Sequence, residues 1–127
     1  MNKNQKTILI IEDKISLIGM VVEKLEREGF GVLIAENGKV GLEMALKHHP
    51  DVILLDLVMP DINGLELLDN LRTNEDKWGE SAEVILLTDL DNEKITSVVD
   101  RDKCCDCLLN IAWNTEDVVA KVKEKFV

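Results

Sequence analysis

The sequence has little aromatic content and no tyrosine: Phe and Trp make up 3% of its 127 residues. Proteins that bind single-stranded bases stack them on aromatic side chains, so a base-binding surface is not expected. Basic residues are also in the minority, with 15 Lys and Arg against 25 Asp and Glu and a formal net charge of -10. A nucleic-acid or anionic-lipid surface requires the opposite charge. We therefore expect neither nucleic acid nor membrane among the partners.

Long apolar runs and a disulfide framework are missing as well. No segment approaches the roughly 20 apolar residues of a membrane span, and the polar start Met1 to Thr7 lacks the hydrophobic region of a secretory signal. The three cysteines, Cys104, Cys105 and Cys107, lie within four residues, and an odd number so close together does not form a disulfide framework. These absences predict a cytoplasmic protein in a reducing compartment.

The chain consists of alternating apolar segments of two kinds. A length of 127 residues with 46% hydrophobic content predicts one domain over 1–127, structured over about 6–126 after a short polar tail. Short apolar runs predict strands, and apolar residues at helical spacing predict helices. The predicted strands are 7–11, 32–35, 51–57, 83–88 and 105–109, and the predicted helices are 15–25, 40–47, 64–71, 92–100 and 115–126.

This alternation predicts an α/β fold with a doubly wound, five-stranded parallel sheet and helices on both faces. Five such units in one domain fit the flavodoxin-like strand order 2-1-3-4-5. In such sheets the functional crevice lies at the carboxyl ends of the strands, where the strand order reverses. The first and third strands flank that point, so the polar residues that end them should converge.

Acidic residues end both of these strands. Glu12 and Asp13 follow the first strand and Asp56 ends the third, whereas Thr88 and Asn110 end the fourth and fifth. At about 4 Å and an effective dielectric constant near 20, each pair of carboxylates repels by about 4 kcal/mol. The pocket must therefore retain protons or hold a cation, and Mg²⁺ (or Mn²⁺) suits a carboxylate set that leaves room for water and phosphoryl oxygens. Asp56 could then attack phosphorus, with the Thr88 hydroxyl near a phosphoryl oxygen.

A simpler interpretation exists for some of these residues. Asp13 and Thr88 could each be only the N-cap of the following helix. Asp56 is harder to explain in this way, because a charge that ends an apolar strand must be paired or functional.

The segment from Asp51 to Gly64, DVILLDLVMPDING, resembles the phosphoacceptor region of a two-component response-regulator receiver domain. The Glu12-Asp13 pair resembles the family's metal-binding pair, and VILLT, ending at Thr88, resembles its fourth strand with the switch hydroxyl. The resemblance covers about residues 6–126.

The resemblance implies a role for each residue. Asp56 accepts a phosphoryl group from a histidine kinase or phosphotransfer protein, and Thr88 moves toward that group. Mg²⁺ is held by Glu12, Asp13, Asp56 and the Val58 carbonyl. The fourth helix, fifth strand and fifth helix form the face that changes shape and binds a downstream protein. The chain would be a stand-alone receiver of the chemotaxis or phosphorelay type. It would be a monomer or weak dimer, and no enzyme beyond self-phosphorylation and slow autodephosphorylation.

The sequence departs from the family at three positions. Asn110 stands where the family has Lys, so a neutral hydrogen bond replaces a charge-assisted bond to the phosphoryl group. Asp89 follows Thr88 where the family prefers a small residue; it either repels the incoming phosphoryl group or caps the fourth helix. Cys107 stands near the position of the family's switch Tyr or Phe.

Two functional hypotheses follow. In the first, Asp56 is phosphorylated and signals through an atypical conformational change. In the alternative, the chain is a pseudo-receiver, a protein-interaction module that works without phosphorylation. The cysteine cluster also has two interpretations, a metal or redox site or small residues of the core. Adjacent cysteines bind one metal awkwardly, which favours the core.

Overall fold

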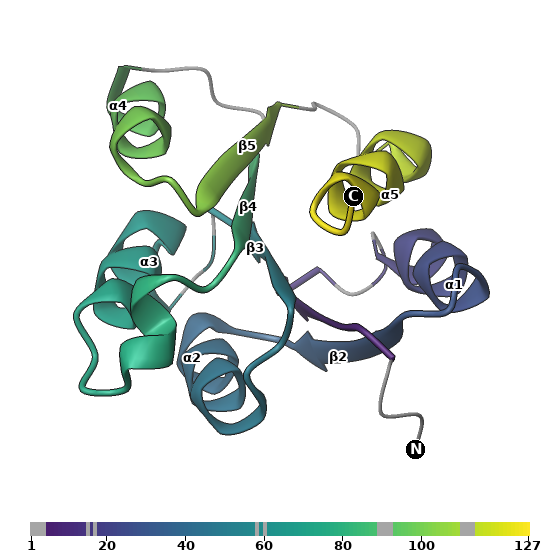
Figure 1. Ribbon diagram of the computed structural model, residues 1–127, viewed down its shortest axis with the longest axis horizontal. Helices are drawn as coiled ribbons and strands as arrows, with labels where there is room; N and C mark the ends of the chain where they lie inside the picture. The colour runs from purple at the N-terminus through teal and green to yellow at the C-terminus, as the bar shows by residue number, and fades with distance from the viewer. Residues whose placement is uncertain are drawn as a thin grey trace.

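The computed structural model describes residues 5–14, 16, 18–57, 59, 61–88, 93–109 and 114–127, with the backbone alone at residues 88, 93, 94 and 109. Strands and helices alternate along the chain (Figure 1). The strands are β1 (Thr7–Ile11), β2 (Gly31–Ala35), β3 (Val52–Asp56), β4 (Val84–Thr88) and β5 (Cys105–Leu109). The helices are α1 (Gly19–Arg27), α2 (Gly38–His48), α3 (Gly64–Arg72), the 3-10 turn η2 (Lys77–Glu80), α4 (Glu93–Arg101) and α5 (Thr115–Glu124).

The five strands form one parallel sheet in the order β2-β1-β3-β4-β5, as the sequence predicts. Strands β1 and β3 are buried on both faces, which is why both are almost entirely apolar. They lie side by side, with Ile11 paired to Leu55. This register brings the residues that follow Ile11 next to Asp56.

Helices cover both faces of the sheet. Figure 1 shows α1 and α5 on one face and α2, α3 and α4 on the other. Each face has its own apolar core, because alternate strand residues point to opposite sides. Ile10, Leu54 and Val118 belong to the core beneath α1 and α5, whereas Leu9, Ile53 and Leu67 belong to the core beneath the other three helices.

The helices begin next to their N-cap residues, and hydrophobic periodicity alone misplaces some of these starts. The Asn37 side chain accepts a hydrogen bond from the Val40 amide at 2.9 Å, so α2 begins at Gly38 rather than at Val40. Helix α1 begins at Gly19, not Ile15, and its N-cap residue Ile18 makes no side-chain cap bond. Asp13 is therefore not the N-cap of α1. Asn114 caps α5, its side chain accepting from the Glu116 and Asp117 amides.

The segment 73–83 between α3 and β4 contains the 3-10 turn η2. Asp76 caps this turn and also lies 2.7 Å from Nε2 of His49, the residue that ends α2 in a left-handed conformation. The His49 ring stacks on Trp78 with centroids 4.4 Å apart. A stacked ring pair with a hydrogen bond beside it thus holds the end of α2 against η2.

The cysteines pack as part of the core. Cys105 is buried, and Cys107 packs against the core cluster that α3 and α4 cover. Burial raises the pKa of the Cys105 thiol to about 12, so this thiol stays protonated and is a poor metal ligand. The core interpretation of the cluster therefore fits the structure. No helix in the described part of the chain is long and apolar enough to cross a membrane.

Candidate functional site: an acidic pocket at the carboxyl ends of the strands

Three carboxylates meet at the carboxyl ends of β1 and β3. Glu12 and Asp13 follow β1, and Asp56 is the last residue of β3. One ligand oxygen from each residue lies within 4.8 Å of the others. Across the described residues this is the only group of three acidic, histidine or cysteine side chains close enough to share a metal ion. The parallel pairing of β1 and β3 produces it.

Glu12 is the buried member of the group, with 1% of its surface exposed. Its Oε1 accepts a hydrogen bond from the Lys14 amide at 2.9 Å, and its own amide donates to the Ala35 carbonyl at 3.0 Å. Burial, together with smaller effects of the neighbouring Asp56 and Asp13 and against the hydrogen bond from the Lys14 amide, raises the Glu12 pKa to about 8. Without a cation Glu12 therefore keeps its proton near neutral pH, and this reduces the repulsion among the three groups.

Asp13 supplies the sign that the pocket suits a cation. Its Oδ1 is buried and has no hydrogen-bond partner in the described structure. A buried polar atom without a partner costs about 1–3 kcal/mol, and more when it is charged. A divalent cation would satisfy this oxygen and bring Asp13, Asp56 and the ionised Glu12 together.

The donor chemistry also fits the predicted ion. Three carboxylates form a hard oxygen set, which Mg²⁺ and Mn²⁺ prefer over nitrogen or sulfur. Mg²⁺ takes six ligands and keeps several waters, so three side chains leave positions for water or phosphoryl oxygens. Glu12, Asp13 and Asp56 are thus the side chains that would hold the ion.

Leu57, the residue after Asp56, is in close contact with the start of α3. Gly64 donates its amide hydrogen to the Leu57 carbonyl at 3.1 Å, and Asn63 caps α3 by accepting from the Glu66 amide. A Cβ at position 64 would lie 2.8 Å from Leu57 Cα and 2.9 Å from the Asp56 carbonyl oxygen. Only glycine allows this approach, which explains its place in the motif.

The loop after Asp56 also contacts α2, and this contact is not evident from the sequence. Asp61 accepts hydrogen bonds from the amides of Gly38, at 3.1 Å, and Lys39, at 3.0 Å. The hydrogen bonds from Gly38 and Lys39 lower the Asp61 pKa. The carboxylate thus stays charged at the positive end of the α2 dipole.

The remaining predicted site residues are described only partly or not at all. Thr88 ends β4 by its backbone, which places it at the carboxyl edge of the sheet beside the acidic pocket's strand β3. Val58, Asp89 and Asn110 lie outside the described residues. Cys107 is half-buried on β5, on the face that α3 and α4 cover.

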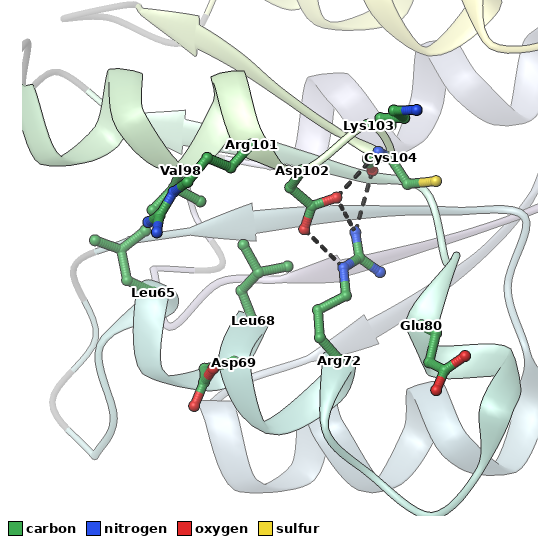
Figure 2. Close-up of a pocket in the computed structure, with 10 residues that line it drawn as sticks. All are labelled: Leu65, Leu68, Asp69, Arg72, Glu80, Val98, Arg101, Asp102, Lys103 and Cys104. Atoms are coloured by element: carbon green, nitrogen blue, oxygen red, sulfur yellow. Dashed lines mark hydrogen bonds and ion pairs between the residues drawn. The ribbon is translucent and has the colours of Figure 1, made fainter.

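A hollow with a volume of about 470 Å³ lies between α3 and α4, apart from the acidic pocket (Figure 2). Arg72 lies within it, paired with both carboxylate oxygens of Asp102 at 2.8 and 3.1 Å. The guanidinium also donates to the carbonyls of Gly79, Ala82 and Cys104. These carbonyls lie in η2 and just before the amino ends of β4 and β5, at the sheet edge opposite the acidic pocket. The hollow is thus built around a structural ion pair.

Comparisons with known proteins identify the class. The family profile described as the response regulator receiver domain matches residues 8–109. The response regulator ArlR of Staphylococcus saprophyticus is 34% identical over 116 residues, which are 91% of this chain and 50% of that protein. The alkaline phosphatase synthesis transcriptional regulatory protein PhoP of Bacillus subtilis is 29% identical over 118 residues, 93% of this chain and 47% of PhoP.

Solved structures agree. A CheY-like receiver domain protein from Methanospirillum hungatei superposes with a TM-score of 0.80 at 27% identity, covering 96% of this chain and 94% of the other. The chemotaxis response regulator CheY4 of Vibrio cholerae gives a TM-score of 0.83 at 23% identity, covering 96% and 99%, and supports the fold alone.

The fold and the matched family profile define a receiver-type signalling domain. The chain belongs to the response regulator receiver domain family. It spans about half the length of the curated relatives it matches.

Proposed function

We propose that this domain receives a phosphoryl group on Asp56, in a reaction that depends on a divalent cation, from a histidine kinase or phosphotransfer protein. The observation that carries the proposal is the convergence of Glu12, Asp13 and Asp56 around an unpartnered, buried Asp13 oxygen. A pocket without a cation would gain nothing from this arrangement, because the three groups repel one another.

The transfer requires a nucleophile and charge neutralisation. An Asp56 carboxylate oxygen forms a bond to phosphorus while the bond from phosphorus to the donor atom breaks. The donor leaves with the electron pair and takes a proton from solvent. Bound Mg²⁺ supplies positive charge that offsets the developing negative charge on the phosphoryl oxygens. Glu12 and Asp13 hold the ion, and Asp56 is both a ligand and the acceptor.

Four further residues have roles in the proposed phosphorylation switch. The Val58 carbonyl is a further ligand, and the Thr88 hydroxyl donates to a phosphoryl oxygen. Asn110 donates a neutral hydrogen bond where the family has Lys, so the phosphorylated state is stabilised less. Asp89 sets access to the pocket. The change in shape is read by a downstream protein at the face formed by α4, β5 and α5.

The protein works as one signalling domain over residues 1–127, in the cytoplasm. Its own chemistry is limited to self-phosphorylation and slow autodephosphorylation. A second candidate, the pseudo-receiver, is favoured by Asn110 and Asp89, because the first removes a cation from the phosphoryl site and the second adds an acid beside it.

Phosphorylation by a small donor separates the two candidates. The protein is incubated with acetyl phosphate and Mg²⁺ and its intact mass is compared with that of Asp56→Asn. We expect an adduct of one phosphoryl group in the wild type, which does not form when a chelator is present from the start and is missing from Asp56→Asn. A folded wild-type protein that shows no adduct with acetyl phosphate or with a phosphotransfer protein would support the pseudo-receiver.

A further inference from the structure

The start of α2 depends on a residue of the phosphoacceptor loop. A helix begins with amide groups that have no partner within the helix. In α2 the Val40 amide donates to the Asn37 side chain and the Gly41 amide to the Asn37 carbonyl. The two amides before them, of Gly38 and Lys39, donate to Asp61. Asp61 thus completes a cap that Asn37 alone cannot provide.

Packing holds the same contact in place. A Cβ on Gly38 would lie 1.9 Å from Ile62 Cγ2, so the absence of a side chain lets residues 61 and 62 sit directly on the first turn of α2. Gly38 is buried there. The contact therefore combines two charge-assisted hydrogen bonds with close backbone packing.

The position of Asp61 in the chain gives this contact a consequence for the acidic pocket. Only residues 57–60 separate Asp61 from Asp56 in the chain. The first of them, Leu57, is itself held by the hydrogen bond that its carbonyl accepts from the Gly64 amide. The fixed end of α2 thereby limits how far the backbone beside Asp56 can move. The Asp61 charge is also directed toward the helix amides, where the dipole stabilises it.

We propose that Asp61 is a positioning residue: by capping α2 it holds the loop after Asp56 in place and so raises the affinity of the acidic pocket for a divalent cation. The inference rests on the proposed function, since it assumes that Glu12, Asp13 and Asp56 bind such an ion. Asp61 itself is not a ligand, because both of its oxygens accept amide hydrogens from α2.

The test compares cation affinity in Asp61→Ala and Asp61→Asn with the wild type, by titration of Mn²⁺ followed through its electron spin resonance signal. Asp61→Ala removes both acceptors, and we expect Mn²⁺ affinity to fall about fivefold, less than the roughly 10–100-fold loss caused by removing a direct partner of a metal ligand, because Asp61 acts through the loop. Asp61→Asn keeps one oxygen acceptor and should lose about twofold. Phosphorylation by acetyl phosphate at saturating Mg²⁺ should stay within about twofold of the wild-type rate, because bound ion restores the loop.

Asp51→Ala is the matched control. Asp51 is also an exposed carboxylate that accepts a backbone hydrogen bond, from Thr7 at 2.7 Å, but at the opposite edge of the sheet. It should leave Mn²⁺ affinity unchanged even if it lowers stability. Circular dichroism melts of each variant confirm that the compared proteins are folded.

Two results would overturn the proposal: an Asp61→Ala protein that binds Mn²⁺ as tightly as the wild type, or an Asp51→Ala protein that weakens binding equally. Failure of the proposed function looks different. A wild type that binds Mn²⁺ but accepts no phosphoryl group removes the proposed function and leaves the Asp61 comparison valid. A wild type that binds no Mn²⁺ overturns both.

Discussion

Single residues at the acidic pocket are fixed by local contacts that differ in how far the sequence can predict them. The convergence of Glu12, Asp13 and Asp56 follows from the order of β1 and β3, and this was predictable from strand ends alone. The hydrogen bonds that the Gly38 and Lys39 amides donate to Asp61 join residues 23 and 22 positions apart. No periodicity connects such residues, so the only available signal was an unexplained acid inside the DVILLDLVMPDING segment.

Gly64 provides a test at this scale. Replacing it with Ala would place a Cβ against the Leu57 backbone and the Asp56 carbonyl, neither of which can move without shifting the phosphoacceptor. We expect Gly64→Ala to lower the free energy of unfolding by about 2 kcal/mol, the typical cost of overpacking. Denaturant unfolding followed by circular dichroism measures the change.

Gly19→Ala is the control for that substitution. Nothing lies within 4 Å of a Cβ built on Gly19, which starts α1. Its stability should equal the wild type or exceed it by about 0.5 kcal/mol, because alanine loses less backbone entropy in a helix. Equal stability of Gly64→Ala and wild type would contradict the close approach that the structure shows.

At the scale of elements, the sequence predicts which segments are helices and strands but not how their ends are joined. All five strands and all five helices lie where apolar patterning places them, with boundaries shifted by a few residues. The start of α1 is misplaced because apolar spacing alone does not mark where a helix begins, and the structure begins α1 at Gly19. The 3-10 turn η2 was missed because His49 and Trp78, which stabilise it, meet only in the folded protein.

The ion pair between Arg72 and Asp102 connects several elements that lie far apart in the sequence, and neither helical nor strand periodicity predicts such a contact. Its side chains are only 15% and 18% exposed, and Arg72 also satisfies three carbonyls at the ends of η2, β4 and β5. Removing Arg72 would leave the Asp102 carboxylate largely buried without its cation. We expect Arg72→Ala to lose about 3 kcal/mol of unfolding free energy.

Arg27→Ala is the comparison for this prediction. Arg27 pairs with Glu23 on the surface of α1, with side chains 73% and 62% exposed. Such a pair contributes about 0.5 kcal/mol or less, so this variant should be nearly as stable as the wild type. Thermal unfolding of both variants at equal concentration makes the comparison. Similar losses in the two would show that Arg72 is no more than a surface charge.

In the whole molecule, the carboxyl ends and the amino ends of the strands carry different kinds of contact. The carboxyl edge gathers Glu12, Asp13 and Asp56, whose mutual repulsion opposes folding unless a proton or cation is present. The amino edge is held by Arg72, Asp102 and the contact between Asp51 and Thr7. This division follows from the parallel topology, which the alternating pattern predicted. The raised Glu12 pKa and the buried Asp13 oxygen without a hydrogen-bond partner could not be predicted from the sequence, since burial is a property of the folded chain.

The most direct measurement of the central claim, that these three carboxylates form one cation site, is a Mn²⁺ titration of the wild type at a pH near the Glu12 pKa of about 8. We expect one Mn²⁺ per chain, displaced by Mg²⁺, with affinity at least about tenfold lower in Asp13→Asn. Asp69→Asn removes an exposed carboxylate of α3 and should bind as the wild type does. A wild type without saturable binding, or an Asp13→Asn protein with unchanged affinity, would contradict the account.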